Sequence, residues 1–343
     1  MLLNTDFMDL TRIYLFLILI FLGSCKPEKQ PKTINRAVYF WKTTFDLRQK
    51  ERAFLDENKV EKIYLRFFDV DILGNEAVPK GILRLKSKVS QEIIPTVFIT
   101  NRVFEKTKIN EIENLAERIV SQIQMISNSY REIQIDCDWT LGTKEKYFYF
   151  LKTLREKTEN KIKLSATIRL HQIKFYEKTG IPPVDEGILM LYNTGEWRKL
   201  AIENSIFDPR TVLKYLDNLS KYPMELNFAF PIFQQVLVYR NGIFYTFIKN
   251  CSSQEILGET AFEKAKIEGQ FLCKNDVQFK NISFRKNDIL KFENVNLNEI
   301  ETIKIDILKN IKANKTTLIL YHLDEKNISN FDSKKISKLF SEN

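Results

Sequence analysis

The stretch that decides the fold is Glu132-Ile133-Gln134-Ile135-Asp136-Cys137-Asp138-Trp139-Thr140. Its polar and apolar residues alternate with period two, as in a β-strand whose two faces meet different surroundings. The polar face is expected to carry Gln134, Asp136, Asp138 and Thr140. It therefore holds two carboxylates two residues apart, and a buried carboxylate needs a partner or a functional role. The alternative is an edge strand whose polar face meets water.

Seven further apolar strands are predicted around this one, and helical patterns separate most of them. The strands are expected at residues 37–41, 62–71, 93–100, 163–170, 187–193, 224–233 and 316–324. Helical spacing is found at residues 47–58, 109–126, 144–157, 208–219, 297–311 and 333–340. Eight strands alternating with helices predict an α/β fold, a (β/α)8 TIM-type barrel over residues 36–343.

The interval between strands seven and eight is too long for one crossover. We expect residues 235–298 to form an insertion on the barrel rim, with a hairpin at Asn241-Gly242. This segment also contains Cys251 and Cys273, a plausible disulfide pair if the protein is exported. The alternative is a separate small C-terminal domain that starts near residue 235.

Composition narrows the class of partner. The chain of 343 residues is 44% hydrophobic, which is enough for a large core, and its net charge is +9. Its basic residues are interleaved with acids, whereas a nucleic-acid-binding protein gathers them in a stripe, so no nucleic-acid partner is expected. With two His and no CxxC motif, the sequence predicts neither a metal nor a cofactor.

The N-terminus indicates export. Residues 13–22 form a short apolar run behind Arg12, typical of a secretory signal. Leu22-Gly23-Ser24-Cys25 resembles the lipobox of bacterial lipoproteins, which implies cleavage before Cys25 and acylation of its thiol. Residues 1–24 would then be a signal peptide and residues 25–35 a lipidated tether, placing the protein in the cell envelope, at the outer membrane if the cell has one. The alternative is an uncleaved anchor with an incidental cysteine.

Candidate site residues lie where the predicted strands end, because barrel sites form at the C-terminal ends of strands. Asp136 and Asp138 are the catalytic candidates. The candidate ligand-binding residues are Trp41, Asp69, Asp71, Arg169, His171, Tyr192 and Asn193. Arg169 on the neighbouring strand is expected near Asp138 or Asp136, where it would keep a carboxylate ionised. A purely structural ion pair is the alternative.

Two of these stretches carry a resemblance. Asp136-Cys137-Asp138-Trp139-Thr140 resembles the end of the Asp-x-x-Asp-x-Asp-x-Glu motif of chitinase-like family 18 glycoside hydrolases. Met190-Leu191-Tyr192-Asn193 resembles their Met-x-Tyr-Asp motif. The resemblance implies a barrel related to enzymes that cleave β-linked N-acetylhexosamine sugars by substrate assistance. It aligns Asp138 with the assisting carboxylate and Tyr192 with the assisting hydroxyl.

The departures from the family pattern are equally informative. Thr140 stands where the family has its acid Glu, and Asn193 where it has Asp. A threonine hydroxyl does not titrate near neutral pH and cannot be a general acid. The chain also resembles exported bacterial lipoproteins with an Asp-x-Asp-Trp-Thr strand, which imply no activity.

Whether the protein is an enzyme stays open at this point. The leading hypothesis is a monomeric surface lipoprotein whose glycoside-hydrolase-like barrel acts on, or binds, a glycan or peptidoglycan-like ligand. The alternatives are a non-catalytic glycan-binding or partner-binding envelope lipoprotein and, with less support, a metal-dependent phosphodiesterase built on the acidic strand ends.

Overall fold

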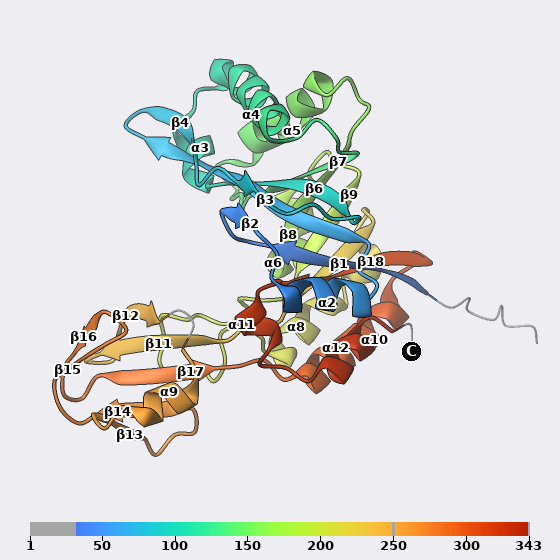
Figure 1. Ribbon diagram of the computed structural model, residues 1–343. Coiled ribbons are helices and arrows are strands. Elements are labelled where there is room, and N and C mark those ends of the chain that lie inside the picture. Colours follow the sequence, from blue (N-terminus) through green and yellow to red (C-terminus); the bar gives the residue numbers. More distant parts are fainter. Residues whose placement is uncertain (1–31, 249–250, 342–343) are drawn as a thin grey trace, which may run out of the picture.

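The structure is a computed structural model that describes residues 32–248 and 251–341. Eight parallel strands form a closed ring, because β1 pairs with both β18 and β3 (Figure 1). This ring confirms the predicted barrel. In chain order its strands are β1 (Thr33–Phe40), β3 (Lys62–Leu73), β6 (Glu92–Ile99), β7 (Glu132–Asp136), β8 (Lys163–Arg169), β9 (Glu186–Met190), β10 (Leu226–Pro231) and β18 (Lys315–Tyr321).

Helices pack around the ring, and the largest hydrophobic core lies between them and the strands. The stripe predicted on α4 (Ile112–Ile126) is buried, with Leu115 and Ile119 in that core. α8 (Pro209–Leu216) begins with proline, as expected, and the Asp208 side chain accepts a hydrogen bond from the Arg210 amide. The others are α2 (Gln49–Glu57), α3 (Asn101–Lys106), η1 (Ile109–Glu111), α5 (Lys144–Lys157), α6 (Leu170–Lys174), α7 (Tyr176–Thr179), η2 (Leu219–Lys221), α10 (Leu297–Asn310), α11 (Glu325–Ile328) and α12 (Ser333–Leu339).

The strand β7 has the two faces that its sequence predicts. Ile133 and Ile135 lie in the core between barrel and helices, whereas Gln134 points into the barrel, where its amide donates to the Tyr39 hydroxyl. β7 pairs with β6 on one side and β8 on the other, so the edge-strand alternative is wrong. The strand was predicted to span residues 133–139, but it ends at Asp136, which leaves Asp138 and Thr140 in the loop above it.

The connection from β3 to β6 differs from the other crossovers. β3 continues past the barrel and pairs with the antiparallel strand β4 (Glu76–Lys80) in a projecting hairpin. Below the hairpin, the two short strands β2 (Thr44–Phe45) and β5 (Arg84–Leu85) pair with each other. No helix forms in this connection, so the second crossover is made of strands and loops.

The segment between β10 and β18 forms the predicted insertion. Five of its strands make an antiparallel sheet in the order β12-β11-β17-β14-β13. The Asn241-Gly242 hairpin joins β11 to β12, with both residues at positive φ, as a tight hairpin requires. Its elements are β11 (Gln235–Arg240), β12 (Ile243–Ile248), α9 (Ser253–Gly258), β13 (Phe262–Lys264), β14 (Gln270–Cys273), β15 (Val277–Phe279), β16 (Ile282–Phe284) and β17 (Ile289–Glu293).

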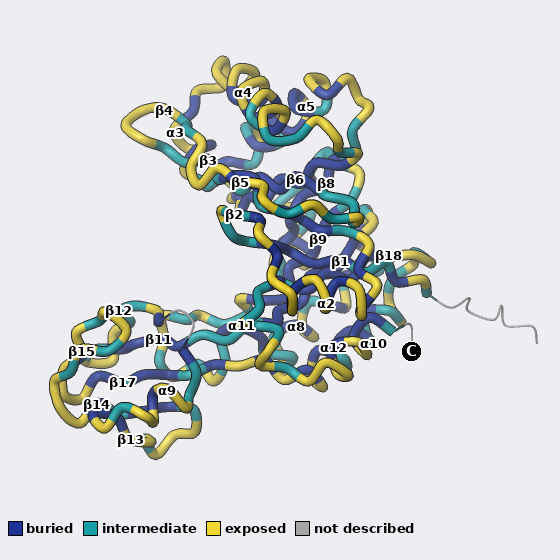
Figure 2. The backbone as a smooth tube through the Cα atoms, in the orientation of Figure 1, coloured by how far each residue is buried: buried dark blue, intermediate teal, exposed yellow. Residues whose placement is uncertain are grey.

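The insertion has a hydrophobic core of its own. In Figure 2 buried positions follow β11, β17 and β14 separately from those of the barrel. Cys251 and Cys273 are both buried in this second core and are free thiols, so the expected disulfide is not formed. The chain then returns to the barrel through α10 and β18, which rules out a C-terminal domain running from residue 235 to the end.

The predicted signal peptide, Cys25 and most of the tether lie outside the described residues. In the part of the chain that the structure does describe, no helix has the length and apolarity needed to cross a membrane.

Candidate functional site

The inward side chains of β7 form layers that change in character toward the C-terminal end of the barrel. Glu132 is the deepest and accepts hydrogen bonds from Ser165 Oγ at 2.6 Å and from the Tyr64 hydroxyl at 3.4 Å. In the next layer, Thr96 Oγ1 donates to Gln134 Oε1 at 2.9 Å. These polar groups are satisfied by their neighbours and fill the barrel. Asp136 forms the layer above them.

Asp136 is a buried carboxylate close to the mouth of the barrel. Its side chain is 8% exposed and accepts one hydrogen bond, from Thr167 Oγ1 at 2.8 Å. Burial raises the pKa of Asp136 to about 6, the Asp138 charge adds to the rise, and the nearby Arg169 guanidinium opposes it. Asp136 is therefore a group that gains and loses its proton close to neutral pH.

Asp138 and Arg169 form the ion pair expected from neighbouring strands. Arg169 Nε lies 2.5 Å from Asp138 Oδ1 and Nη2 lies 3.0 Å from Oδ2, so the contact is bidentate. The Asp138 side chain is 51% exposed, while that of Arg169 is 25% exposed. The sequence left two carboxylates open as partners of Arg169, and the structure selects Asp138.

Aromatic rings fill the centre of the mouth. Tyr192 and Tyr321 stack with their ring centroids 4.6 Å apart. Tyr39 and Trp41 each lie within 6 Å of Tyr321, with centroid distances of 5.7 and 5.8 Å. Burial raises the pKa of the Tyr192 and Tyr321 hydroxyls, so both stay protonated at physiological pH. The mouth thus combines flat apolar faces with neutral hydroxyl donors.

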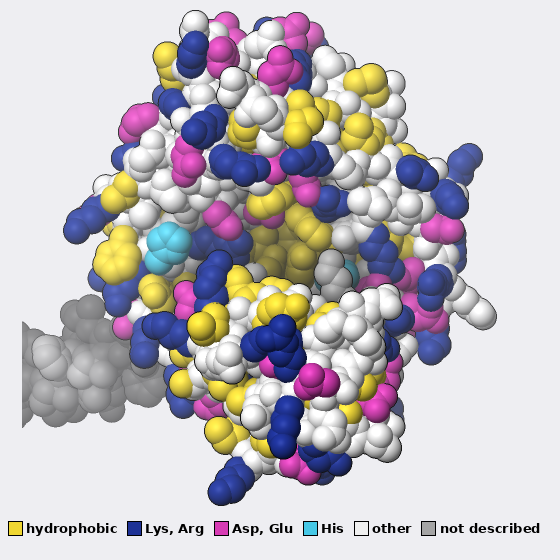
Figure 3. Space-filling view, turned by 90° about the vertical axis from the view of Figure 1, so that its left-hand side faces the viewer, with side chains coloured by type: hydrophobic (Ala, Val, Ile, Leu, Met, Phe, Trp, Pro, Cys, Tyr) yellow, Lys and Arg dark blue, Asp and Glu magenta, His cyan; other side chains and the backbone are white. Residues whose placement is uncertain are grey.

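A cleft of about 540 Å³ opens beside these rings, at the C-terminal ends of β7, β8 and β9. In Figure 3 this face is hollowed between the barrel above and the insertion below. Hydrophobic side chains, coloured yellow together with Tyr and Trp, form the floor of the hollow. Among the described residues that line the cleft, Asp138 is the one carboxylate. The lining includes six residues named from the sequence: Asp138, Thr140, Arg169, His171, Tyr192 and Asn193.

The other predicted ligand-binding residues lie outside this cleft. Asp71 is in the part of β3 that projects beyond the barrel, where its carboxylate contacts Lys80, Thr100 and Arg102. The hydrogen bond from Arg102 is the main reason why the pKa of Asp71 is strongly lowered. Asp69 is paired with Arg66 at 2.5 Å. Trp41 belongs to the aromatic group at the mouth.

The C-terminal end of β18 is also occupied by internal contacts. Asp324 pairs with Lys42 at 2.7 Å and caps α11. The residue at this end that sequence reasoning missed is Tyr321, which reaches the mouth. Its signal was present, because Thr317, Ile319 and Tyr321 share the inward parity of the strand.

Trp197 forms part of the opposite wall of the cleft, on the loop after β9. Its ring packs against Phe244 and Phe247 of the insertion, with centroid distances of 4.5 and 5.1 Å. The Arg198 guanidinium lies over the same ring at 3.9 Å. Trp139 also lines the cleft, but its ring is buried in the outer core, where it stacks on Tyr147.

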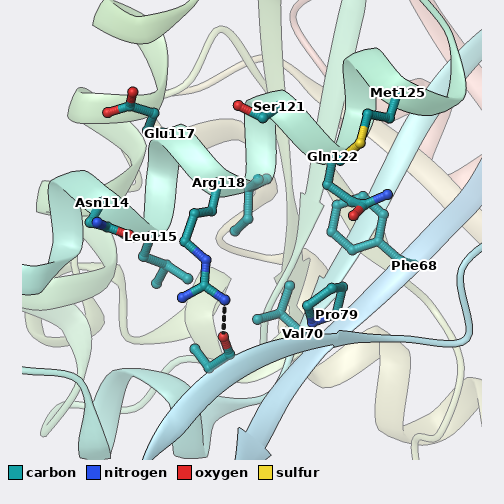
Figure 4. Close-up of a pocket in the computed structure, with 12 residues that line it drawn as sticks. Phe68, Val70, Pro79, Asn114, Leu115, Glu117, Arg118, Ser121, Gln122 and Met125 are labelled. Carbon is teal, nitrogen blue, oxygen red and sulfur yellow. Dashed lines mark hydrogen bonds between the residues drawn. The ribbon is translucent and has the colours of Figure 1, made fainter.

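A second groove, of about 510 Å³, lies on the side of the barrel between α4 and the β3–β4 hairpin (Figure 4). Phe68 and Val70 lie at its base, and Arg118 donates a hydrogen bond to the Ala77 carbonyl at 2.8 Å. This groove and the cleft described above have no lining residue in common. Across the described residues, no group of three or more His, Cys, Asp or Glu side chains is arranged to hold a metal ion.

Comparison with solved structures supports the architecture. The spore cortex-lytic enzyme SleL of Bacillus megaterium QM B1551 matches with a TM-score of 0.54 and 12% identity, covering 92% of this chain and 76% of SleL. A chitinase from Chromobacterium violaceum ATCC 12472 has a TM-score of 0.54 and 9% identity, covering 90% of this chain and 99% of the enzyme. A class V chitinase from Pseudomonas fluorescens Pf-5 has a TM-score of 0.54 and 12% identity, covering 90% and 100%.

At these identities the similarity shows a shared fold alone. It confirms the barrel that the family 18 resemblance implied. A scan against models of protein families gives no match, and neither does a search of curated proteins.

Proposed function

We propose that this protein is an envelope lipoprotein that binds a glycan in the cleft at the ends of β7, β8 and β9. The observation that carries the proposal is the composition of the cleft. It brings the Asp138–Arg169 ion pair into one cleft with the aromatic side chains of Tyr192 and Trp197. Sugars are recognised by hydrogen bonds to their hydroxyl and acetamido groups and by aromatic faces that pack on their rings. The solved structures of this fold described above are two chitinases and a spore cortex-lytic enzyme, which directs the proposal to glycans that contain N-acetylhexosamine.

Binding is favoured over hydrolysis by what the cleft lacks. Glycoside hydrolysis uses a general acid together with a second carboxylate or an assisting substrate group. Thr140 lines the cleft at the family's acid position and offers a hydroxyl that does not titrate near neutral pH. Asp138 is already engaged by Arg169. The pair can orient an acetamido group without breaking a glycosidic bond.

Calorimetric titration with chitin and peptidoglycan oligosaccharides tests the proposal. We expect saturable binding without release of shorter products. Trp197→Ala and Asp138→Asn should each weaken binding about tenfold, the usual scale for a residue that dominates a contact. Glu301→Gln is the matched control, because it removes a carboxylate ion pair on α10, away from the cleft. The absence of binding to every glycan fragment would contradict the proposal.

A glycosidase is the second candidate, and one observation favours it. Asp136, with its pKa raised to about 6, has the titration range of a general acid. This reading predicts product release in the same titrations and its loss in Asp136→Asn. Product release that survives Asp136→Asn would exclude Asp136 as the acid.

A further inference from the structure

The loop that follows β9, residues 193–208, has two supports: Ile206 and Phe207 near its end are buried in the barrel core, and its middle contacts the insertion. The Tyr239 hydroxyl of β11 donates to the Trp197 carbonyl at 2.7 Å. Lys199 forms an antiparallel bridge with Ile243 at the start of β12. The Asn204 amide donates to the Asn294 carbonyl at 2.8 Å. These contacts come from different elements of the insertion and converge on one loop.

A buried ion pair lies at the centre of this contact. Lys291 and Glu293 on β17 are 5% and 1% exposed at their side chains, and their charged atoms are 2.7 Å apart. Both also bind the loop: Lys291 donates to the Ile202 carbonyl, and Glu293 accepts from Ser205 Oγ at 2.6 Å. Gln235 completes the group by donating to Glu293 at 2.8 Å. Burying two charges is costly unless hydrogen-bonding partners surround them. Because loop residues supply some of these partners, the ion pair favours one position of the loop.

The same loop carries one wall of the cleft. Asn193, Thr194 and Trp197 line it, and the Trp197 ring is held by Phe244 and Phe247 of the insertion and by Arg198. The two ends of the loop are joined by a hydrogen bond of its own, in which the Asp208 amide donates to Thr194 Oγ1 at 2.7 Å. Between those ends, the Gly195 amide donates to the Ser205 carbonyl at 3.2 Å within the loop, and the insertion binds the loop from outside through Tyr239 and the Lys291–Glu293 pair.

We infer that Tyr239, Lys291 and Glu293 are positioning residues that hold Trp197 in place as a wall of the cleft. The insertion would then determine the glycan affinity of the barrel without having to touch the glycan. Pre-ordering an aromatic side chain removes the entropy that ligand binding would otherwise lose. The expected effect on glycan affinity rests on the proposed function. The position of Trp197 does not, because it can be measured without any ligand.

Tyr239→Phe is the sharpest variant. It keeps the buried ring, which is 1% exposed, and removes only the hydroxyl that binds the Trp197 carbonyl. The chain has three tryptophans, so a ¹H–¹⁵N spectrum should show three indole signals, and Trp197→Phe identifies the one from Trp197. In Tyr239→Phe we expect that signal to shift or broaden while the signal of the core residue Trp139 stays unchanged.

The control is Tyr149→Phe, which removes a hydroxyl hydrogen bond to Glu113 on the helices and should leave the Trp197 signal in place. Where a glycan ligand binds, Tyr239→Phe should weaken it about fivefold, the equivalent of one net hydrogen bond, and Tyr149→Phe should not. Lys291→Met with Glu293→Gln replaces the charged pair by neutral side chains of similar length and should move the same indole signal.

An unchanged Trp197 signal in both Tyr239→Phe and the double variant overturns the inference. A shifted signal with unchanged glycan affinity also overturns it, because Trp197 would then be positioned without consequence for binding. A shifted signal in a protein that binds no glycan leaves the positioning supported and contradicts the proposed function instead.

Discussion

At the scale of single residues, the site depends on how the protein divides charge between two carboxylates. Asp136 and Asp138 are two residues apart, yet their surroundings differ. Asp136 is buried with a single hydroxyl donor, whereas Asp138 is half exposed and paired with a guanidinium. Burial of a carboxylate favours the protonated form, and a nearby cation favours the ionised form. The structure therefore contains one carboxyl that titrates near neutral pH and one whose charge is compensated.

The stability of the protein should depend on the protonation of Asp136. Its pKa is about 6 in the folded state and about 3.8 when unperturbed. Between these values the folded state binds more protons than the unfolded state, so the free energy of unfolding falls as pH rises from about 4 to 6 and is level above that range. The shift of about two pH units corresponds to at most about 3 kcal/mol.

Asp136→Asn should remove this dependence, because the amide is neutral at every pH and its oxygen can still accept from Thr167. Denaturant titrations at several pH values between 4 and 8 measure the effect. As pH rises from about 4 to 6, the free energy of unfolding of the variant should increase relative to that of the wild type. Parallel curves for the two proteins would show that Asp136 titrates at its ordinary pKa.

Arg169 should control the proton affinity of Asp136. Its positive charge lowers the pKa of Asp136, and Arg169→Met removes that charge while keeping an apolar stem. We expect the pKa of Asp136 to rise above 6, measured by NMR titration of the carboxyl carbon. Lys174→Met, which removes a cation of α6 that lies over Phe175, serves as the control. A fall in the pKa, or no change, would argue against the electrostatic coupling.

At the scale of elements, β9 shows how tightly the barrel is packed. A Cβ atom on Gly187 would lie 2.7 Å from Leu226 Cδ2 and 2.8 Å from Ile168 Cγ1. At such distances the Leu226 and Ile168 side chains have to shift, and they have little room to do so because protein interiors hold few voids. Gly187→Ala should lower the free energy of unfolding by about 1–3 kcal/mol, measured by denaturant titration.

Gly258→Ala provides the comparison for that measurement. This glycine ends α9, and nothing lies within 4 Å of its added methyl group. We expect little loss of stability there, since alanine is the better helix former. If both variants lose the same amount of free energy of unfolding, the close packing around Gly187 is not the reason for a glycine in β9.

Much of the element pattern could be predicted, because it follows from local periodicity. The alternation around Asp136 fixed which side chains face the barrel, and neighbouring parallel strands bring Arg169 to Asp138. The role of Trp197 could not be predicted, because it depends on contacts between a loop and residues of the insertion about fifty positions away in sequence. The partners of Asp71 could not be predicted for the same reason. β3 extends into a hairpin, and Arg102, from the crossover after β6, donates to the Asp71 carboxylate.

At the scale of the whole molecule, one loop contacts both the barrel and the insertion. The barrel core and the insertion core are separate clusters; the loop at residues 193–208 places Ile206 and Phe207 in the barrel core, and its Trp197 packs on Phe244 and Phe247 of the insertion. Substitutions in the barrel or in the insertion should therefore both affect the cleft. The barrel supplies Asp138 and Tyr192, and the insertion supplies the support for Trp197.

The last prediction concerns where this molecule resides. Leu22-Gly23-Ser24-Cys25 behind an apolar run leads us to propose a lipid on Cys25, and one acyl chain alone gives only reversible membrane binding. A lipoprotein that carries several acyl chains should enter the detergent phase after Triton X-114 partitioning of bacteria that express it. Cys25→Ser should move it to the aqueous phase, because the acylated thiol is gone, while Cys251→Ser should leave it in the detergent phase. An uncleaved apolar anchor predicts the contrary result, in which Cys25→Ser stays with the detergent and keeps its N-terminal residues in the mass spectrum.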